Sequence, residues 1–327
     1  MKSLFFGPAK QITSVAEYIE VVKNRPEEES KDLPHPRYVY RGQADTAYIF
    51  SPSIERDQFD ASLESRLIDM AKNKRPNEFK TADKLTLLAK MQHYGLPTRL
   101  IDFTTNPLVA LFFACQNEDK DGEVLEFEQH VYRTGEALSA YTSLTFAEPW
   151  SHEEKGSYRN MCENIIWRYY SYDFQKQLIL STVGNIPRNG ITVEDFHTRI
   201  VDEPWFVNWE RMIFRGFLDN EKQCEILAAL LRCPIFVEAQ ETLERQRLQQ
   251  GLYLLIPNEV AVENGKYVIK PNLPELNLWD SNVGHIIITA EAKKAILKEL
   301  DLIGINEGFL FGDSIDHVCV QIKKSFV

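Results

Sequence analysis

The stretch MQHYGLPTRLIDFTTNP, residues 91–107, separates two apolar helices that the sequence predicts at 82–94 and 108–115. Its Gly-Leu-Pro is typical of a helix end, and Asn106-Pro107 is typical of an N-cap followed by proline in the first helical turn. Between these signals lie an imidazole, a phenol, a guanidinium, a carboxylate and three threonines. Polar groups so close to apolar helices must bond to one another, to backbone or to a ligand. The stretch is therefore the first candidate for a functional site.

Two of its features are open to more than one interpretation. Arg99 and Asp102 either form an ion pair, with the threonines capping the following helix, or contact a ligand. His93 closes a helix beside a glycine, so it acts either as a C-terminal cap or as a general base.

The chain on either side alternates irregularly between short helices and short strands. Helices are predicted at 12–24 (capped by Thr13 or Ser14), 62–73, 221–231 and 290–302, and strands at 38–40, 123–132, 233–237, 252–256 and 284–289. Residues 25–36 are a charged, proline-bearing linker, and 241–250 are a polar turn or helix. The absence of a regular strand–helix alternation favours an α+β fold over a doubly wound sheet.

A second candidate site is Tyr40-Arg41-Gly42-Gln43, where the predicted strand ends in an arginine followed by a glycine turn. The planar guanidinium donates two parallel hydrogen bonds, which suits a diphosphate, and glycine lets a ligand approach the backbone closely. The alternative is a surface salt bridge at the end of a strand.

The organisation that follows is one domain with a long insertion. Residues 1–36 are an N-terminal helix and linker, 37–133 and 221–327 are the two parts of the core, and 134–220 are a largely helical insertion rich in aromatic residues. The rings of this insertion form either a satellite hydrophobic cluster or a surface for a partner or substrate.

Composition narrows the class of protein. The chain has 327 residues with 48 acidic and 37 basic side chains, a net charge of −11, and 44% hydrophobic residues, so it is globular and acidic. Its pI near 5.3 argues against nonspecific binding to nucleic acid through net charge. An anionic ligand must therefore be met locally, by Arg41, Arg99 and Arg245.

Several common sites are missing from the sequence. The five cysteines and seven histidines fall in no metal-ligand spacing, so we expect no metal. The dinucleotide and ATP glycine loops and the Gly-x-Ser-x-Gly elbow are absent. No apolar stretch approaches the length of a membrane helix and no signal peptide is recognisable, so we expect a cytoplasmic protein without membrane contact.

Together, the motifs resemble the FRG domain family, named for its Phe/Tyr-Arg-Gly signature. The matching segments are Tyr40-Arg41-Gly42-Gln43, Ser51-Pro52-Ser53 with Arg56, Glu64, the stretch 92–102, and 106–114. The resemblance continues through Arg245, Gln249, Gly251 and Tyr253 and ends within 296–316. Two positions depart from the family pattern: Phe103 stands where tryptophan is common, and Gly312 stands where proline is usual.

A more distant resemblance suggests an activity. An arginine ending one strand, a Thr-Thr pair before a helix and a polar residue on a third strand are similar to the layout of ADP-ribosyltransferases. This resemblance implies a mixed, mainly antiparallel sheet flanked by helices, with NAD as the substrate.

The same resemblance assigns roles to residues. It makes Arg41, Thr104 and Gln249 catalytic, and the residues that bind NAD are Arg41, Gly42, Gln43, His93, Tyr94, Thr98, Arg99, Asp102 and Thr105. In this arrangement Arg41 clamps a phosphate, the Gly42 backbone meets the nicotinamide amide, and a ring such as Tyr94 stacks on nicotinamide. Thr104 and Thr105 hold the nicotinamide ribose.

Gln249 falls on the third-strand position, where better-known transferases carry glutamate. Glutamine holds a ribose hydroxyl but cannot offset the positive charge of an oxocarbenium ion. The carboxylates that remain to supply this charge are Asp102, Glu64 and Glu244.

The resemblance therefore implies an NAD-dependent ADP-ribosyltransferase, or an NAD glycohydrolase, acting on an intracellular macromolecule that is a protein or a nucleic acid. It further implies a toxin or phage-defence effector, with an antitoxin or other regulatory partner. The alternative is a non-catalytic FRG module that binds a nucleotide or a protein.

Overall fold

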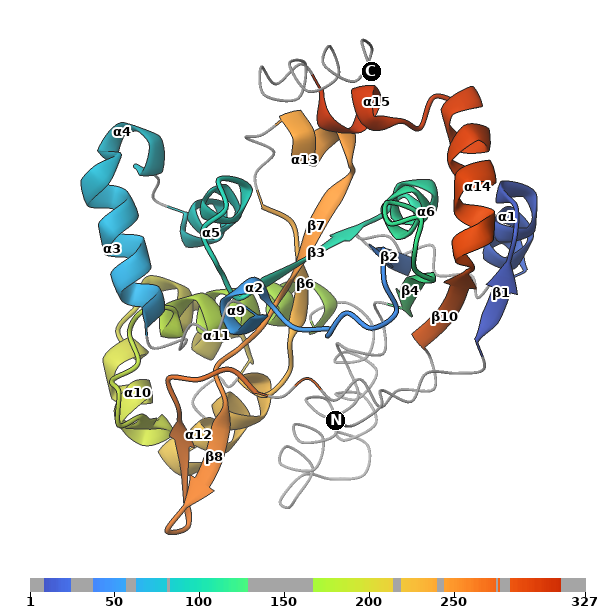
Figure 1. The fold of residues 1–327 in the computed structure, drawn as a ribbon. Coiled ribbons are helices and arrows are strands. Elements are labelled where there is room, and N and C mark those ends of the chain that lie inside the picture. The colour runs from blue at the N-terminus through green and yellow to red at the C-terminus, as the bar shows by residue number, and fades with distance from the viewer. Residues whose placement is uncertain are drawn as a thin grey trace, which may run out of the picture.

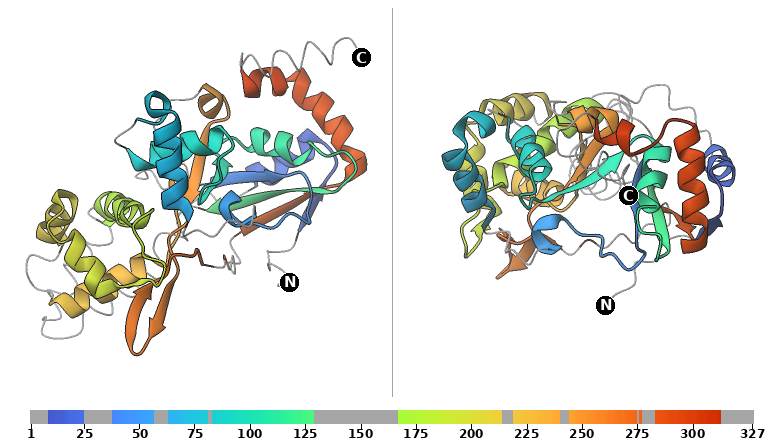
Figure 2. Two further views of the ribbon diagram at one scale, coloured as in Figure 1. Left: turned by 60° about the vertical axis from the view of Figure 1, so that its left-hand side comes forward. Right: turned by 45° about the horizontal axis from the view of Figure 1, so that its top comes forward.

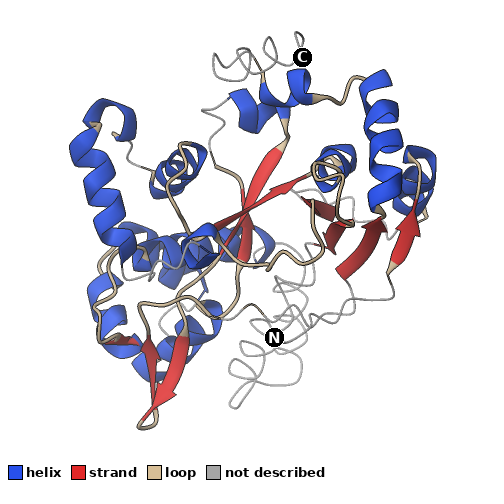
Figure 3. Cartoon of the chain, in the orientation of Figure 1, coloured by secondary structure: helices blue, strands red, loops and turns tan. Residues whose placement is uncertain are grey.

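The computed structural model describes residues 9–24, 38–56, 63–80, 83–128, 167–213, 219–239, 244–274, 276 and 283–312. They form an α+β fold with one large sheet, one small sheet and helices around both, which confirms the predicted fold class (Figure 1, Figure 3). No helix within these ranges is both long enough and apolar enough to cross a membrane.

The large sheet has seven strands in the order β1-β10-β4-β2-β3-β7-β6. The strands are β1 (Lys10–Ile12), β2 (Tyr38–Gln43), β3 (Leu100–Thr104), β4 (Gly122–Glu128), β6 (Ile235–Val237), β7 (Gly251–Leu255) and β10 (Val283–Ile288). Only β1 and β10 pair in parallel, and all other neighbours are antiparallel. The sheet is thus mixed and mainly antiparallel, as the resemblance implied.

The helices are α1 (Val15–Lys23), α2 (Ser53–Arg56), α3 (Glu64–Lys74), α4 (Pro76–Phe79), α5 (Lys84–His93), α6 (Pro107–Ala114), α9 (Trp167–Thr182), α10 (Val193–Ile200), α11 (Pro204–Ile213), α12 (Asn220–Leu230), α13 (Glu244–Leu248), α14 (Ala290–Leu302) and α15 (Glu307–Phe311). The predicted caps are confirmed, since the Ser14 side chain accepts from the Glu17 amide and the Asn106 side chain accepts from the Leu108 amide at 3.0 Å. Helix α5 begins after Asp83, whose carboxylate accepts from the Thr86 amide at 2.9 Å.

Helices α5 and α6 cover different halves of one sheet face. Buried residues of α5 share a hydrophobic cluster with Leu100 and Leu255. Those of α6 share another with Tyr40, Val124 and Ile286. Ile101, Phe103 and other residues pointing to the opposite face form a third cluster. Between α5 and α6 the sheet face is left to polar side chains.

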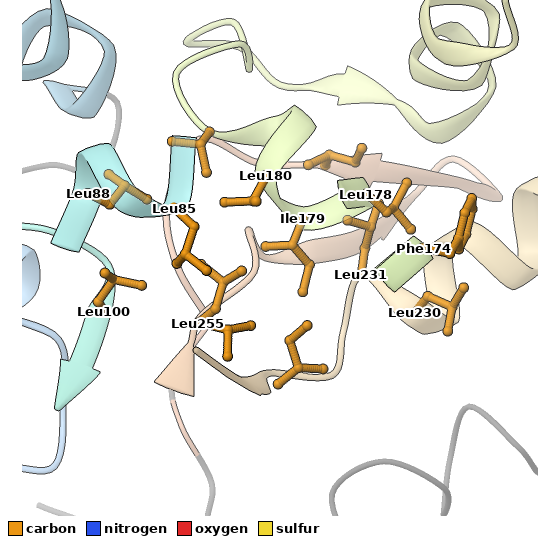
Figure 4. Packing of buried hydrophobic residues seen from close by; sticks show 14 of the residues in the cluster. Leu85, Leu88, Leu100, Phe174, Leu178, Ile179, Leu180, Leu230, Leu231 and Leu255 are labelled. Carbon is orange, nitrogen blue, oxygen red and sulfur yellow. The ribbon is translucent and has the colours of Figure 1, made fainter. Parts of the chain in front are cut away.

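The described part of the insertion belongs to the main core. Phe174, Leu178 and Ile179 of α9 lie in the same cluster as Leu85 and Leu255 (Figure 4). The expected satellite cluster is therefore wrong for this part, because α9 packs directly against the core side chains of α5 and β7. Residues 134–166 of the insertion lie outside the described ranges, as do residues 129–132 of the strand predicted at 123–132.

A second sheet escaped the sequence interpretation. Strands β5 (Ile191–Thr192), β9 (Lys266–Ile269) and β8 (Val260–Glu263) pair antiparallel, and the β8–β9 hairpin projects from the body (Figure 2). Its turn is Asn264-Gly265, with φ of 51° and 77°. Asn-Gly between two short apolar runs is a strong hairpin signal, so the sequence did contain the information.

Strand β2 does not end at Arg41. It continues through Gly42 to Gln43, both paired with β4, so the predicted glycine turn is wrong. The glycine has a packing reason, since a Cβ there would lie 1.9 Å from the Ala110 carbonyl oxygen of α6. Gly122 of β4 is similar, with a Cβ that would lie 2.1 Å from the Ala114 oxygen. Two glycines on adjacent strands therefore let α6 lie directly on the sheet.

Arg99 is held by a buried ion pair with Glu64 of α3. Its Nε donates to both carboxylate oxygens at 3.0 and 3.1 Å, and both side chains are 1% exposed. Its Nη1 donates to Asn258 Oδ1 at 2.9 Å. Of the two alternatives for Arg99, the ion pair with Asp102 is wrong, because residues three apart along an extended chain point to opposite sides. Arg99 instead ties α3 to the chain that follows β7.

Replacing Arg99 with methionine should therefore destabilise the fold by about 3–5 kcal/mol, because Glu64 would remain as an uncompensated buried charge. Urea unfolding followed by circular dichroism measures this loss. The control is Arg247→Met, which removes an exposed ion pair with Glu244 at 3.9 Å and should cost less than about 1 kcal/mol. Equal losses in the two variants would contradict a structural role for the buried pair.

Gly42→Ala should also destabilise the protein, by about 1–3 kcal/mol or more, because the added methyl meets the α6 backbone rather than a flexible side chain. The same unfolding measurement applies. Gly251→Ala is the matched control, since its Cβ would lie 3.4 Å from the nearest atom, an ordinary contact. A Gly42→Ala protein as stable as the Gly251→Ala protein would show that α6 does not need this close approach.

Candidate functional site

A cavity of about 310 Å³ opens on the sheet face between α5 and α6, with α13 at its side. In Figure 1, α5 lies to the left of β3 and β7, α6 to their right and α13 above them. The lining residues come from six segments: Tyr40, Arg41 and Gly42; Gln92 and His93; Asp102, Phe103 and Thr104; Val109, Ala110 and Phe113; Arg245, Gln246 and Gln249; and Tyr253. Elements distant in sequence thus build one site.

The register of the sheet explains why Asp102 faces the cavity. In β3, Leu100, Asp102 and Thr104 point to the α5–α6 side, whereas Ile101 and Phe103 point to the opposite core. Asp102 lies opposite Tyr253 of β7 and is the exposed residue of an otherwise buried strand. The carboxylate therefore stands over the middle of the sheet with no apolar residue covering it.

Asp102 is oriented by a chain of hydrogen bonds from the α5 end. Its Oδ1 accepts from Gln92 Nε2 at 2.8 Å. The Gln92 Oε1 accepts from the hydroxyl of Thr98, and that hydroxyl oxygen accepts from the Leu100 amide at 3.2 Å. Because the Thr98 hydroxyl donates to Gln92, the amide oxygen of Gln92 must face Thr98. The NH₂ group of the same amide then faces Asp102. The chain thus holds the Asp102 carboxylate in one orientation, as a hydrogen-bond acceptor.

Arg41 links two strands across the cavity floor. Its Nη1 donates to the main-chain oxygen of Asp102 at 2.7 Å, next to the single aligned pair between β2 and β3, Tyr40 with Thr104. Burial lowers the pKa of Arg41 from its ordinary value, and the charge of Asp102 opposes this change. The guanidinium nevertheless stays charged at neutral pH.

Unsatisfied polar atoms belong to two residues of the cavity lining. Across the described ranges, three buried side-chain nitrogen or oxygen atoms have no hydrogen-bond partner: Arg41 Nε and both amide atoms of Gln246. Both residues line the cavity. Buried polar groups are nearly always paired in folded proteins, so each exception calls for an explanation. A ligand that supplies the missing partners is one.

Arg245 brings a second cation to the rim. Its guanidinium lies 4.5 Å from the ring centre of Phe311, a cation–π contact that holds the charge in place. Burial lowers the pKa of Arg245, and Asp102 opposes this. Burial and the charge of Arg245 together lower the pKa of His93, so this imidazole is neutral at pH 7.

Six of the sequence-predicted site residues meet at the cavity: Arg41, Gly42, His93, Asp102, Thr104 and Gln249. Gly42 differs from the other five because it has no side chain to offer a ligand, and the α6 backbone occupies the space that a side chain would fill. This close packing leaves no room for a ligand on that side of its backbone.

The other five lie elsewhere. Gln43 is buried and donates to Glu123 at 2.7 Å, Thr98 and Arg99 are buried in the contacts described above, and Thr105 bonds through its amide to the Gln250 oxygen at 3.1 Å. Tyr94 is 58% exposed, with its ring edge-on to His93 at 5.1 Å between centroids. None of these five lines the cavity.

Thr104 and Gln249 reach the cavity with side chains that already form hydrogen bonds within the fold. The Thr104 hydroxyl donates to the Gln249 main-chain oxygen at 2.7 Å and accepts from the Asn106 amide at 2.9 Å. The Gln249 Nε2 donates to the Leu310 oxygen at 3.1 Å. Contrary to the expectation, Gln249 does not lie on the third strand. It lies between α13 and β7, just before a turn at Gln250 with φ of 47°.

The three spare carboxylates are now distinguished. Glu64 is paired with Arg99, and Glu244 does not line the cavity. Of the three, only Asp102 lines the cavity.

The sequence did not point to Gln92 or Gln246 as residues of the site. Gln92 lies within the stretch 91–107 and Gln246 follows Arg245, but a glutamine beside a charged residue carries little signal by itself. Among the described residues, no cluster of three potential ligands could hold a metal ion.

In the comparison with known proteins, one family model matches a part of the chain. Residues 36–123 match the model of the FRG domain, which covers the β2 motif and the stretch from α5 through α6. The match ends before Arg245, so the resemblance expected through Tyr253 and within 296–316 is not part of it. No characterised protein matched the sequence, and no solved structure matched the chain. Nothing in these comparisons supports the resemblance to ADP-ribosyltransferases.

The coupling between Arg245 and His93 is measurable. Because a nearby cation disfavours the imidazolium ion, Arg245→Gln should raise the pKa of His93 towards its unperturbed value of about 6.5. Titration of the His93 ring protons by NMR follows this change. Arg247→Gln on the same helix removes an exposed guanidinium outside the cavity and should leave the His93 pKa in place. A His93 pKa unaffected by Arg245→Gln would mean that the two side chains are too far apart to share a ligand.

Proposed function

We propose that the cavity binds NAD and that the protein cleaves it, transferring ADP-ribose to a macromolecular acceptor inside the cell or to water. The observation that carries the proposal is that two arginines and the residues with unpartnered buried polar atoms line a single cavity. A diphosphate needs such donors, because arginine binds phosphate oxygens through paired N–H groups.

The volume fits part of a dinucleotide. Pockets that enclose drug-sized ligands span about 300–1,000 Å³, so about 310 Å³ suits one nucleotide half, with the rest over the rim. Arg41 at the floor and Arg245 at the rim lie on different sides of the lining, from β2 and α13. We therefore assign the diphosphate to the space between them and the nicotinamide riboside to the interior.

Asp102 is the group that can support the chemistry. The C1′–N bond to nicotinamide breaks, its electron pair leaves with nicotinamide, and C1′ develops positive charge before the acceptor attacks and loses its proton. A fixed carboxylate stabilises that charge, and Gln92 holds Asp102 in place. The neutral imidazole of His93 is available to take the acceptor's proton.

A second function is favoured by a specific observation. The Thr104 hydroxyl donates to the Gln249 main-chain oxygen, and the Gln249 Nε2 donates to the Leu310 oxygen. Arg41 Nη1 donates to the main-chain oxygen of Asp102. A module that binds a nucleotide without altering it needs only the remaining donors. The nature of Asp102 decides between the two, since binding tolerates its neutralisation and cleavage does not.

The test is incubation with NAD labelled on the adenine side, in the presence of cell lysate. The wild-type protein should release nicotinamide, with label in macromolecules marking transfer and label in free ADP-ribose marking hydrolysis. Asp102→Asn should reduce release by about 100- to 1,000-fold, because it keeps the shape and removes the charge, while NAD binding stays within about threefold. Arg41→Ala should weaken binding itself by at least about tenfold.

Arg247→Ala, outside the cavity, should match the wild type in both measurements. Nicotinamide release that Asp102→Asn leaves intact would overturn the assigned chemistry. Binding by the wild type without any release, lost in Arg41→Ala, would instead establish the non-catalytic module.

A further inference from the structure

Gln246 stands apart from the other buried glutamines. It lies in α13 beside Arg245, is 7% exposed and packs against Gly251 at the start of β7. Gln43, Gln175 and Gln223 are equally buried, and each donates its amide to a protein acceptor. Neither amide atom of Gln246 has a partner.

An unpartnered buried amide is costly, because water no longer satisfies its donor and acceptor. The fold could avoid this cost with an apolar residue of the same size. The cavity that Gln246 lines provides the missing partner if a ligand brings one. The amide presents one N–H donor and one C=O acceptor side by side.

The ligand group must therefore offer the reverse pattern, an acceptor beside a donor. A primary carboxamide does so, and so does the edge of an adenine ring. A carboxylate or a phosphate offers only acceptors and leaves Gln246 Oε1 unsatisfied. The anionic part of a ligand accordingly belongs to Arg41 and Arg245, and a neutral amide-like part belongs to Gln246.

We propose that Gln246 binds the carboxamide of the nicotinamide ring through paired hydrogen bonds and so selects nicotinamide over nicotinic acid. The identity of the carboxamide rests on the proposed use of NAD. The resemblance assigns this role to the Gly42 backbone, whereas the proposal gives it to Gln246, whose amide has no partner in the fold. Gln246 is thus a specificity-determining residue of the cavity.

The experiment measures binding of three ligands to the full chain by calorimetry. NAD carries both adenine and the carboxamide, nicotinic acid adenine dinucleotide replaces the carboxamide with a carboxylate, and ADP-ribose lacks the nicotinamide ring altogether. The variant is Gln246→Met, which keeps the length and volume of the side chain and removes both polar atoms. Arg247→Met on the same helix is the matched control.

In the wild type, NAD should bind about 10- to 100-fold more tightly than its nicotinic acid analogue. Gln246→Met should lose this preference by weakening NAD alone, with ADP-ribose affinity within about twofold of the wild type. If ADP-ribose weakens as much as NAD, Gln246 reads adenine and the proposal is wrong. If the affinity for NAD is unchanged, Gln246 does not contact this ligand and the proposal is equally wrong.

Thermal unfolding without ligand provides a second, independent readout. Removing an unsatisfied buried amide should leave the melting temperature of Gln246→Met equal to or above that of the wild type. A lower melting temperature would mean that the amide serves the fold, which overturns the inference even if NAD binds.

The two proposals fail separately. A wild-type protein that binds NAD in an Arg41-dependent way while Gln246→Met keeps the nicotinamide preference refutes the inference and leaves the proposed function standing. A wild-type protein that binds none of the three ligands refutes the proposed function and, with it, the assignment of nicotinamide to Gln246.

Discussion

The position of the cavity depends on how closely α6 lies on strands β2 and β4. Gly42 and Gly122 bring the helix backbone against the sheet, where any side chain would collide with the carbonyls of Ala110 and Ala114. This contact fixes α6 over one half of the sheet face, while α5 packs over the other half through Leu100 and Leu255. The strip between the helices is left open above β3, and the cavity occupies it.

Within that strip, the period of two along β3 sorts the side chains. Phe103 points into the opposite core, where it meets Phe127 and Phe236 with ring centroids 5.1 and 4.9 Å apart. Asp102 points to the cavity and is oriented there by Gln92. The same alternation directs Arg99 away from Asp102 and towards Glu64. One short strand thus separates a structural ion pair from an exposed carboxylate available for chemistry.

The acidity of the chain gives the two cavity arginines their significance. A net charge of −11 repels anions over most of the surface. Arg41 and Arg245 place two positive charges in the lining of one cavity, and the Arg41 Nε has no hydrogen-bond partner in the fold. Arg41 is partly buried, which strengthens its interaction with an anion, because less water screens it. Asp102 beside them limits how much negative charge the site accepts, which favours a ligand that also carries a neutral or cationic part.

The sequence alone determined what depends on near neighbours. The Ser14 and Asn106 caps, the α5 and α6 helices and most strands of the large sheet follow from turn chemistry and periodicity within a few residues. The Asn264-Gly265 hairpin was equally readable and was overlooked. The motif around Arg41 and the stretch 91–107 pointed to the cavity, which the structure then built from both.

Only the tertiary structure decided which polar groups meet. Arg99 pairs with Glu64, 35 positions earlier, rather than with Asp102 nearby. Gln249 is committed to Leu310, and Gln246, one helical turn before it, is left without a partner. A side chain's partners depend on which elements pack together and on which face each residue points to, and neither is encoded locally. Sequence therefore placed the candidate residues, whereas packing decided which of them serve the fold and which remain free for a ligand.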